Sequence, residues 1–480
     1  MAFLPVLLWS DLVIWLLVAA LCVLAWNVAR NPPLKAAWGR VIHSRTGMAS
    51  LAVLATFVAV GLLDSVHYRP RLAATPDAAG QAQARPVYGV EVLSALDALL
   101  TPLRTRVEKT YSAPLATRAY AKEMQEVRAD DGSLRQERDY PRLKFGGAHL
   151  GAEEGHLWSD VARRLLAGLS LAFVAWWALA ALLATRLARQ EQCAPAKAWQ
   201  RLWRRPATST APAWDALLFT VAGLLLVLTP LLALAPEYHV LGTDKVGQDV
   251  LYQILKSIRT ALVIGLVTTL VTLPIGILLG IAAGYFRGWI DDAIQYVYTT
   301  LNSIPGVLLI AAAVLMMQVV IDTHPEWFST AAERADLRLL ALCFILGMTS
   351  WTGLARLLRG ETLKLSQLEY VQAAQSFGVS SWRILLRHIL PNVMHIVLIA
   401  LVMDFSGLVL AEAVLSYVGI GVDPTMISFG TMINNARMEL AREPMVWWSL
   451  AAAFVFMLVL VLAANLLADV VRDAFDPRAA

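Results

Sequence analysis

The sequence predicts an all-α protein, a polytopic membrane helical bundle of about nine transmembrane helices. Its 480 residues are 58% hydrophobic and only 16% charged, and the mean hydropathy is +0.59, so water cannot solvate most of the chain. Several apolar runs reach the roughly 20 residues that cross a bilayer core. The net charge of +4 is too small to suggest a nucleic-acid partner. We therefore expect contact with membrane lipid and none with nucleic acid.

Apolar runs separated by polar or helix-breaking residues mark the expected spans. They cover residues 9–29, 47–64, 163–185, 214–234, 258–284, 294–320, 338–358, 392–416 and 446–468. Asp11 lies close to the start of the first run, where a carboxylate is costly. Cys22, Cys193 and Cys343 lie in or beside apolar runs without metal-ligand spacing, so we expect neither a disulfide nor a metal site from them.

The charges between the spans predict an orientation. Segment 30–46 has four basic residues and no acid, and segment 186–213 has six basic residues against Glu191. The loop after the seventh span is also basic. The positive-inside rule places these loops in the cytoplasm, with the N-terminus outside, the C-terminus inside and residues 65–162 outside. Residues 1–10 lack a basic region, so a cleaved signal peptide is not expected.

The external stretch 65–162 is the one long segment with a soluble composition. Leucines and Val92 recur at helical spacing over about 90–110, which predicts an amphipathic helix, and a second helix is plausible at 116–128. We expect an ordered, mostly helical insert that either contacts an external partner or caps the bundle. The predicted divisions are 1–64 (two extra spans), 65–162 (insert), 163–213 (third extra span and linker) and 214–480 (core).

Residues 369–391 form a polar segment between two long apolar runs. Gly378 can adopt a positive φ and end a first short helix, and Ser380 or Ser381 can cap a second one. Pro391 then stands at the start of the next span, where a missing N–H costs little. Two short helices at this place make a protruding knob, which is suited to contact with another protein.

This segment resembles the EAA coupling segment of ATP-binding-cassette (ABC) importer permeases. Gln372, Ala373, Ala374, Gly378 and Leu390-Pro391 occupy its pattern, with Gln372 where that family usually has glutamate. The resemblance implies a coupling segment within 360–391 that docks on an ATPase subunit. The implied contact residues are Glu369, Gln372, Ala373, Ala374, Phe377, Gly378 and Arg383.

From about residue 214 onward, the chain resembles the C-type permease subunit of dipeptide/oligopeptide ABC importers. The matching motifs, in order, are Leu241-Gly-Thr-Asp244-Lys-Val-Gly247-Gln248-Asp249-Val250, Gly284-Tyr-Phe-Arg-Gly288-Trp289-Ile-Asp291, Ile304-Pro305, Glu412-Ala-Val-Leu415-Ser416-Tyr417-Val-Gly419-Ile-Gly421, Ser428-Phe-Gly430, and the tail Asn465 to Arg478. Gln248 replaces the family's arginine. The resemblance implies six core spans in a bacterial inner membrane and a solute of the peptide class, with metal complexes and opine-like compounds left open.

The resemblance also implies the partners. They are a homologous second permease subunit, two ATP-binding-cassette ATPase subunits and an external substrate-binding protein. The sequence has no Gly-x-x-x-x-Gly-Lys-Ser/Thr phosphate loop, so we expect no cofactor in this chain, no enzymatic activity of its own, and ATP and Mg bound by the partner ATPases. His149 and His156 permit a metal interpretation, but solvated loop residues are the simpler one.

Ionisable residues within apolar runs indicate a partner or a water-filled path. Asp404 lies near mid-span in a run that the resemblance places along the translocation path, and Glu412 lies nearer the outer end. The alternative is a structural carboxylate satisfied by a neighbouring helix, for example by Asn302 or Ser303. Ser406 completes the tentative path set, and Pro305 and Gly407 mark helices that can bend.

Two questions stay open, the class of transport protein and the origin of an internal similarity. A stand-alone channel or secondary transporter would leave the coupling segment unexplained, and the chain shows no repeat of two similar halves. Residues 149–161 faintly echo 239–250, each just before a span, which is explained by a decayed partial duplication or equally by chance.

Overall fold

The computed structural model describes residues 3–71, 88–128, 134–151, 154–203, 212–328 and 330–475. Within these ranges, nine helices or runs of joined helices are long and apolar enough to cross a membrane, which confirms the predicted number and order. They are α1 (Trp9–Arg30), α3 (Arg45–Asp64), α6 (Leu157–Gln190), α8 (Trp214–Leu234), α9 (Val250–Phe286), α11 (Gly306–Thr323), α12 with α13 (Ala331–Ser350 and Thr352–Leu365), α15 through α16 (Ser381–Val418) and α18 (Trp448–Phe475).

The predicted span 294–320 is wrong in its bounds. The chain forms α10 (Gly288–Ser303) and then α11, with an extended Ile304 between them and Pro305 at the N-cap of α11. Proline cannot donate to the preceding turn and disfavours helical geometry in the residue before it, so the break falls at Ile304-Pro305, as the sequence predicts. α11 alone has the length and composition of a span.

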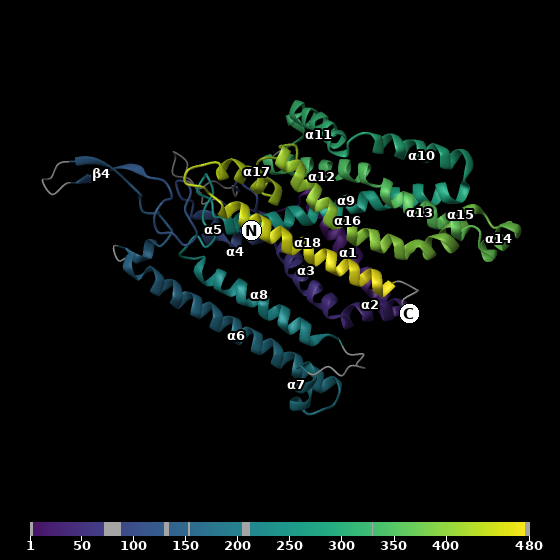
Figure 1. Ribbon diagram of the computed structural model, residues 1–480, viewed down its shortest axis with the longest axis horizontal. Coiled ribbons are helices and arrows are strands. Elements are labelled where there is room, and N and C mark those ends of the chain that lie inside the picture. Colours follow the sequence, from purple (N-terminus) through teal and green to yellow (C-terminus); the bar gives the residue numbers. More distant parts are fainter. Residues whose placement is uncertain are drawn as a thin grey trace, which may run out of the picture.

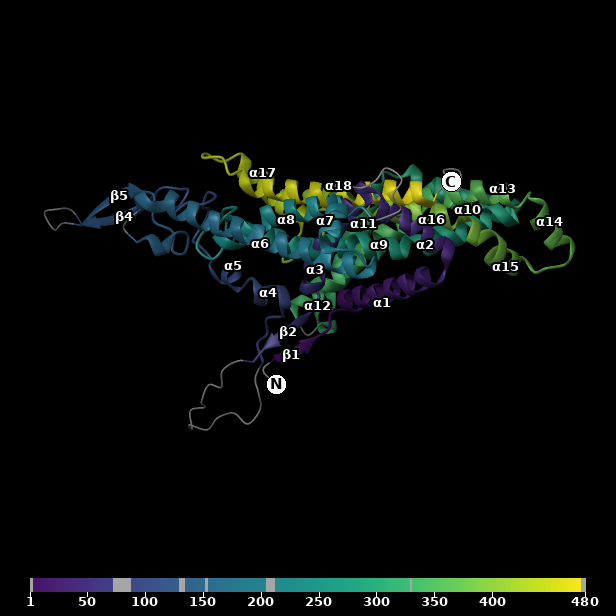
Figure 2. The ribbon, with the colours of Figure 1, turned by 90° about the horizontal axis from the view of Figure 1, so that it is seen from below.

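The loops collect at two opposite ends of the elongated bundle (Figure 1). One end carries the insert, the small sheet of β1 (Phe3–Val6), β2 (His67–Pro70) and β3 (Leu93–Ser94), and α17 (Phe429–Leu440). The other end carries α2 (Pro32–His43) and α14 (Glu369–Ser376), and α7 (Pro195–Trp203) lies at the end of α6 away from the insert. Figure 2 shows the same separation from below. This grouping matches the two sets of loops that the charge pattern predicts.

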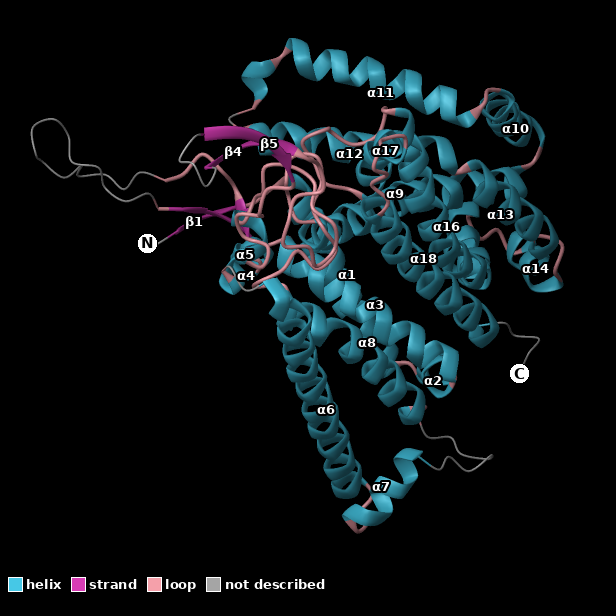
Figure 3. Ribbon diagram, turned by 60° about the vertical axis from the view of Figure 1, so that its left-hand side comes forward, coloured by secondary structure: helices cyan, strands magenta, loops and turns pink. Residues whose placement is uncertain are grey.

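The described part of the insert is not mostly helical. Ahead of α6 its described α-helices are the short α4 (Ala95–Leu99) and α5 (Thr101–Thr105), so the expected helix over 90–110 is interrupted. Of the predicted stripe, Leu93, Leu96, Leu100 and Leu103 are buried, but Leu99 is exposed. The expected helix at 116–128 is wrong: β4 (Glu123–Arg128) pairs antiparallel with β5 (Leu134–Asp139). This hairpin projects from the body in Figures 1 and 2, and Figure 3 shows its strands in magenta. Strand pairing across the turn has overridden the helix-favouring residues of the segment.

The core is built around α9, whose most apolar stretch is half buried inside the bundle. Glycines at four-residue spacing let α13 approach its inner half closely. A Cβ added at Gly280 would lie 2.7 Å from the Ala355 carbonyl oxygen, and one at Gly284 would lie 2.7 Å from the Arg359 carbonyl oxygen. Gly276 faces Leu354 in the same way. Small residues at this spacing are typical of close helix pairs in membranes.

The extra N-terminal helices are fixed to α9 by buried ion pairs. Arg259 Nη2 lies 2.7 Å from Asp11 Oδ1, and Asp336 of α12 lies 4.0 Å from the same guanidinium. One turn away, Lys256 Nζ lies 2.6 Å from Asp64 and 3.1 Å from Asp97. A cavity of about 290 Å³ lies among these residues. Each base is thus already paired with carboxylates, and these pairs join α1, α3 and the insert to the core.

Candidate functional site

The predicted coupling segment forms two short helices broken at a glycine. α14 (Glu369–Ser376) ends at Gly378, whose φ is +73°, and the chain continues through α15 (Ser381–Ile384) and a short π-helix, η4 (Leu385–Ile389), into α16 (Leu390–Val418). Ser380 occupies the N-cap position of α15, but its side chain makes no capping hydrogen bond. The segment lies at the tip of the bundle (Figure 1).

The inner face of this segment is rigidly packed. Val371, Ile384 and Ile389 are fully buried in a cluster with residues of α9, α13 and α16, and Ala374 packs partly against that cluster. Gln375 Nε2 donates to the Tyr285 hydroxyl over 3.2 Å. The knob is therefore a rigid extension of the bundle. Because Ala374 faces the bundle, a bulky residue there would test packing more than docking.

The outer face is left to solvent. The predicted contact residues that are exposed are Glu369, Gln372, Ala373, Phe377, Gly378 and Arg383. Phe377 is 87% exposed, and so is most of Trp382 (63%), a residue that the resemblance does not mark. Exposed aromatic residues on a short polar segment are unusual for a structural loop and typical of contact sites. The signal that identifies Trp382 is the same as for Phe377, an aromatic residue between polar neighbours.

The tentative path residues do not form one group. Ser406 is buried and donates to Asn465 Oδ1 of α18 over 2.6 Å, and Glu412 accepts from Ser416 and Ser428 over 2.6 and 3.0 Å. These contacts hold α16 against α18 and against the start of α17. Asn302 accepts from Thr352, and Ser303 donates to its own helix.

Asp404 is half-buried and has no hydrogen bond or ion pair within the part of the chain that the structure describes. The suggested partners Asn302 and Ser303 therefore do not satisfy it, because both bond elsewhere. A mid-span carboxylate without a protein partner fits a water-filled path better than a packed interior.

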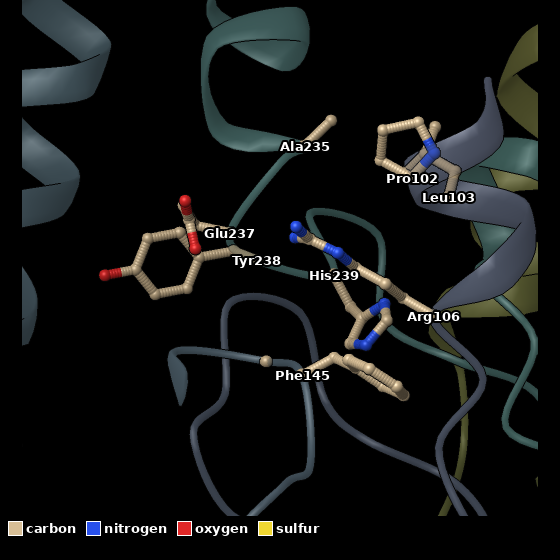
Figure 4. Close-up of a pocket in the computed structure, with 9 residues that line it drawn as sticks. Pro102, Leu103, Arg106, Phe145, Ala235, Glu237, Tyr238 and His239 are labelled. Carbon is tan, nitrogen blue, oxygen red and sulfur yellow. The ribbon is translucent and has the colours of Figure 1, made fainter. Parts of the chain in front are cut away.

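The insert is locked to the loop that precedes α9. Glu108 accepts from the backbone N–H groups of Lys144, Phe145 and Gly146 over 2.7–3.0 Å, and its carboxylate lies 3.4 Å from His239 Nε2. His239 Nδ1 lies 2.8 Å from Asp249, which caps α9. Insert and loop meet here with a cavity of only about 10 Å³, room for one water at most. Figure 4 shows its lining residues, which include Pro102, Leu103, Arg106, Phe145, Ala235, Glu237, Tyr238 and His239.

This junction should weaken at high pH. Burial favours the neutral form of His239 and by itself would lower its pKa. The hydrogen bonds and charges of Asp249 and Glu108 have the larger combined effect, and they raise the pKa of His239 from 6.5 to about 9. Burial acts against charged Glu108 too, but His239 and the three N–H groups lower its pKa to about 2 from 4.5. The stabilisation is therefore complete between pH 4.5 and 6.5 and is lost as the pH rises through about 9 or falls through about 2.

We expect the Tm of the detergent-solubilised protein to fall between pH 6 and pH 9.5, with a loss of roughly 3 kcal/mol from His239. His239→Gln, which cannot titrate, should start from a lower Tm and lose less over the same interval. An equal loss in both proteins would show that another group sets the pH dependence.

His149 also binds a carboxylate. Its Nε2 lies 2.8 Å from Asp160 Oδ2 at the start of α6, and its ring packs edge-on against Tyr238. No group of three metal-binding side chains occurs in the described residues. The pair of His149 and Asp160 differs from that of His239 and Asp249, because His149 uses Nε2 and Asp160 lies within the first turn of α6, whereas His239 uses Nδ1 and Asp249 is the N-cap of α9. The duplication of 149–161 and 239–250 therefore stays a hypothesis.

Known proteins match the second half of the chain. The sequence profile of the binding-protein-dependent transport system inner membrane component matches residues 276–480. The oligopeptide transport system permease protein OppC of Mycobacterium tuberculosis (strain ATCC 25618 / H37Rv) is 32% identical over 239 residues, which are 50% of this chain and 76% of the relative. The glutathione transport system permease protein GsiD of Pectobacterium atrosepticum is 33% identical over 242 residues, 50% of this chain and 73% of the relative.

Among solved structures, a chain of the MetNI methionine ABC transporter in an inward-facing conformation aligns with 47% of this chain and 98% of its own length, at a TM-score of 0.36 and 15% identity. The identity to OppC and GsiD, over about three quarters of their length, identifies the family. The chain belongs to the oligopeptide/dipeptide family of ABC importer permeases, the binding-protein-dependent transport inner membrane components.

Proposed function

We propose that this chain forms half of the translocation path for peptides or similar small solutes and receives the energy of ATP hydrolysis through the coupling segment. The observation that carries the proposal is a rigidly backed knob with an exposed face of Ala373, Phe377 and Gly378. The names of the relatives OppC and GsiD support a peptide-like solute. A stand-alone channel would have no use for this knob.

The proposed complex contains a homologous second permease, two ATPase subunits that bind ATP and Mg, and an external binding protein. Affinity purification of the full chain from its native membrane tests this composition. We expect two ATP-binding chains and a second permease to co-elute in stoichiometric amounts. Elution of this chain alone, with solute transport that needs no ATP, would favour the channel or secondary transporter.

We further propose that the end with the insert faces outward and the end with α2, α7 and α14 faces the cytoplasm. Gly132 of the insert lies outside the described residues, and Ala198 of α7 is fully buried, so neither position suits a cysteine-labelling test. Lys122 and Gln200 are exposed at the two ends. With the native cysteines replaced, Lys122→Cys should react with an impermeant maleimide in spheroplasts, whereas Gln200→Cys should react only after lysis. The reverse pattern would invert the orientation.

Asp404 is the residue that we propose for the path. Asp404→Asn should lower uptake of a radiolabelled tripeptide, and Asp404→Leu should lower it further, because a polar path then meets an apolar side chain. Both variants should reach the membrane in wild-type amounts. Normal uptake by Asp404→Leu would remove this residue from the path.

The insert has two candidate roles, contact with the binding protein or a cap over the outer end. The projection of the β4–β5 hairpin away from the body favours contact with an external partner. A variant with 123–139 replaced by a short linker should keep its ATPase chains but lose stimulation of ATP hydrolysis by the binding protein. Unchanged stimulation of ATP hydrolysis would leave a cap over the outer end as the role of the insert.

A further inference from the structure

Helix α10 is held to α13 along its length by polar contacts. Asp291 accepts from Arg359 through both oxygens, Nε to Oδ1 and Nη2 to Oδ2, each over 2.6 Å. The Arg356 guanidinium lies 5.2 Å from the centre of the Tyr298 ring. At the far end, Thr352 donates to Asn302 over 3.2 Å. The two helices run antiparallel, and the contacts follow one another along the pair.

Apolar packing contributes little to this pairing. Asp291 is the one buried residue of α10, and Trp289, Tyr296 and Val297 are largely exposed. A bidentate pair between arginine and carboxylate fixes orientation as well as distance. α10 and α13 both pack on α9, and the Asp291–Arg359 pair is the strongest direct contact between them.

α13 leads directly into the coupling segment. Residues at the end of α9 and in the turn before α10 also contact this part of the chain. Arg287 Nη2 donates to Ser366 over 2.9 Å, and Tyr285 accepts from Gln375 of α14 over 3.2 Å. Tyr285, Arg287 and Asp291 all belong to the Gly284–Asp291 motif, for which the sequence suggested only a turn. The motif thus contacts α13 at Arg359, the residue that follows α13 at Ser366, and α14 at Gln375.

We propose that the Asp291–Arg359 pair is a positioning link that transmits displacement of the coupling segment to α10 and, across Ile304-Pro305, to α11. The inference rests on the proposed function, since it assumes that an ATPase moves the segment. Neither residue contacts solute or nucleotide in this account. Each acts by making α10 move together with α13.

The test uses the purified complex with its ATPase chains, the native cysteines replaced, and a reporter Thr323→Cys on α11. Thr323 is exposed and is the last residue of α11, at the end of the span, where a water-soluble reagent can reach it. The rate of fluorescein maleimide labelling is measured without nucleotide and with ATP plus vanadate. In the otherwise wild-type protein we expect ATP to change this rate roughly tenfold, within the range typical of coupled sites. Asp291→Asn should reduce the change at least about fivefold while the ATPase chains still co-purify.

Two further variants separate a link from a merely structural contact. The exchange Asp291→Arg with Arg359→Asp restores opposite charges and should restore the ATP-dependent change. The neighbouring Asp292 is exposed and has no hydrogen bond or ion pair among the described residues. Its charge adds only the smallest of the attractions on Arg359, so Asp292→Asn should keep the ATP-dependent change.

Three outcomes would overturn the link. The first is a full ATP-dependent change in Asp291→Asn, and the second is loss of the ATPase chains from that variant. The third is failure of the charge exchange to restore the change while both single variants lack it. If the protein with intact Asp291 shows no response to ATP although ATPase chains are bound, the proposed function itself fails, and the link with it.

Discussion

Phe377→Ala should strip the ATPase subunits from the purified complex. The Phe377 side chain is 87% exposed at the end of α14, so truncation to alanine removes a large apolar contact surface without disturbing the buried cluster behind it. Aromatic anchors at the centre of an interface are worth about 2 kcal/mol or more, which is about thirtyfold in affinity. The measurement is the amount of ATP-binding chain that co-elutes per permease.

Position 378 supplies a matched pair of variants for the same interface. The φ of +73° at Gly378 is accessible to asparagine but strained for a β-branched residue. Gly378→Val should therefore lose ATPase chains as Phe377→Ala does, whereas Gly378→Asn should keep most of them. Full retention of ATPase chains in both Phe377→Ala and Gly378→Val would remove this face from the interface.

Asp11→Asn should destabilise the N-terminal helices by about 3–5 kcal/mol. Arg259 is buried, and Asp11 is its nearest carboxylate, with His67 Nδ1 2.7 Å from the other oxygen of the same group. In Asp11→Asn the buried Arg259 keeps only Asp336, 4.0 Å away, and loss of the nearer partner of a buried ion pair is strongly destabilising. α1 is otherwise largely exposed in the chain, so it depends on the polar contacts at its N-terminal end, those of Asp11 with Arg259 and of Ser10 with Asp336. Thermal unfolding in detergent measures the effect.

Asp215→Asn is the control for that experiment. Asp215 pairs with Arg45 over 2.9 Å, but the Arg45 side chain is 72% exposed, so this pair should contribute no more than about 1 kcal/mol. A loss in Asp11→Asn no larger than in Asp215→Asn would show that the Arg259 cluster does not anchor α1.

Local signals in the sequence were sufficient for the number and order of the spans and for the break in the coupling segment, but not for the bounds of the span predicted at 294–320. Hydropathy marks the helices because lipid requires about 20 apolar residues, and Gly378 and Ile304-Pro305 mark breaks because the backbone restriction acts on the residue itself. The exposed face of the knob could be predicted only through the resemblance to ABC importer permeases.

Contacts between distant segments could not be predicted from the sequence. The carboxylate of Asp11 appears as a misplaced charge near a span, and its partner Arg259 is 248 residues away. The Asp291–Arg359 pair is equally hidden in a motif that suggests only a turn. The β4–β5 hairpin was missed because strand formation depends on pairing with a partner strand, whereas helix propensity is local.

Photocross-linking from Ala373 tests the central claim most directly. Ala373 is exposed on α14, and a benzoylphenylalanine placed there extends from the knob without entering the buried cluster. The full chain is expressed in its native membrane, irradiated and purified, and the cross-linked product is identified by mass spectrometry. The account predicts one dominant product, a cross-link to an ATP-binding-cassette ATPase subunit. A dominant cross-link to lipid or to any other protein, with no ATPase product, would contradict it.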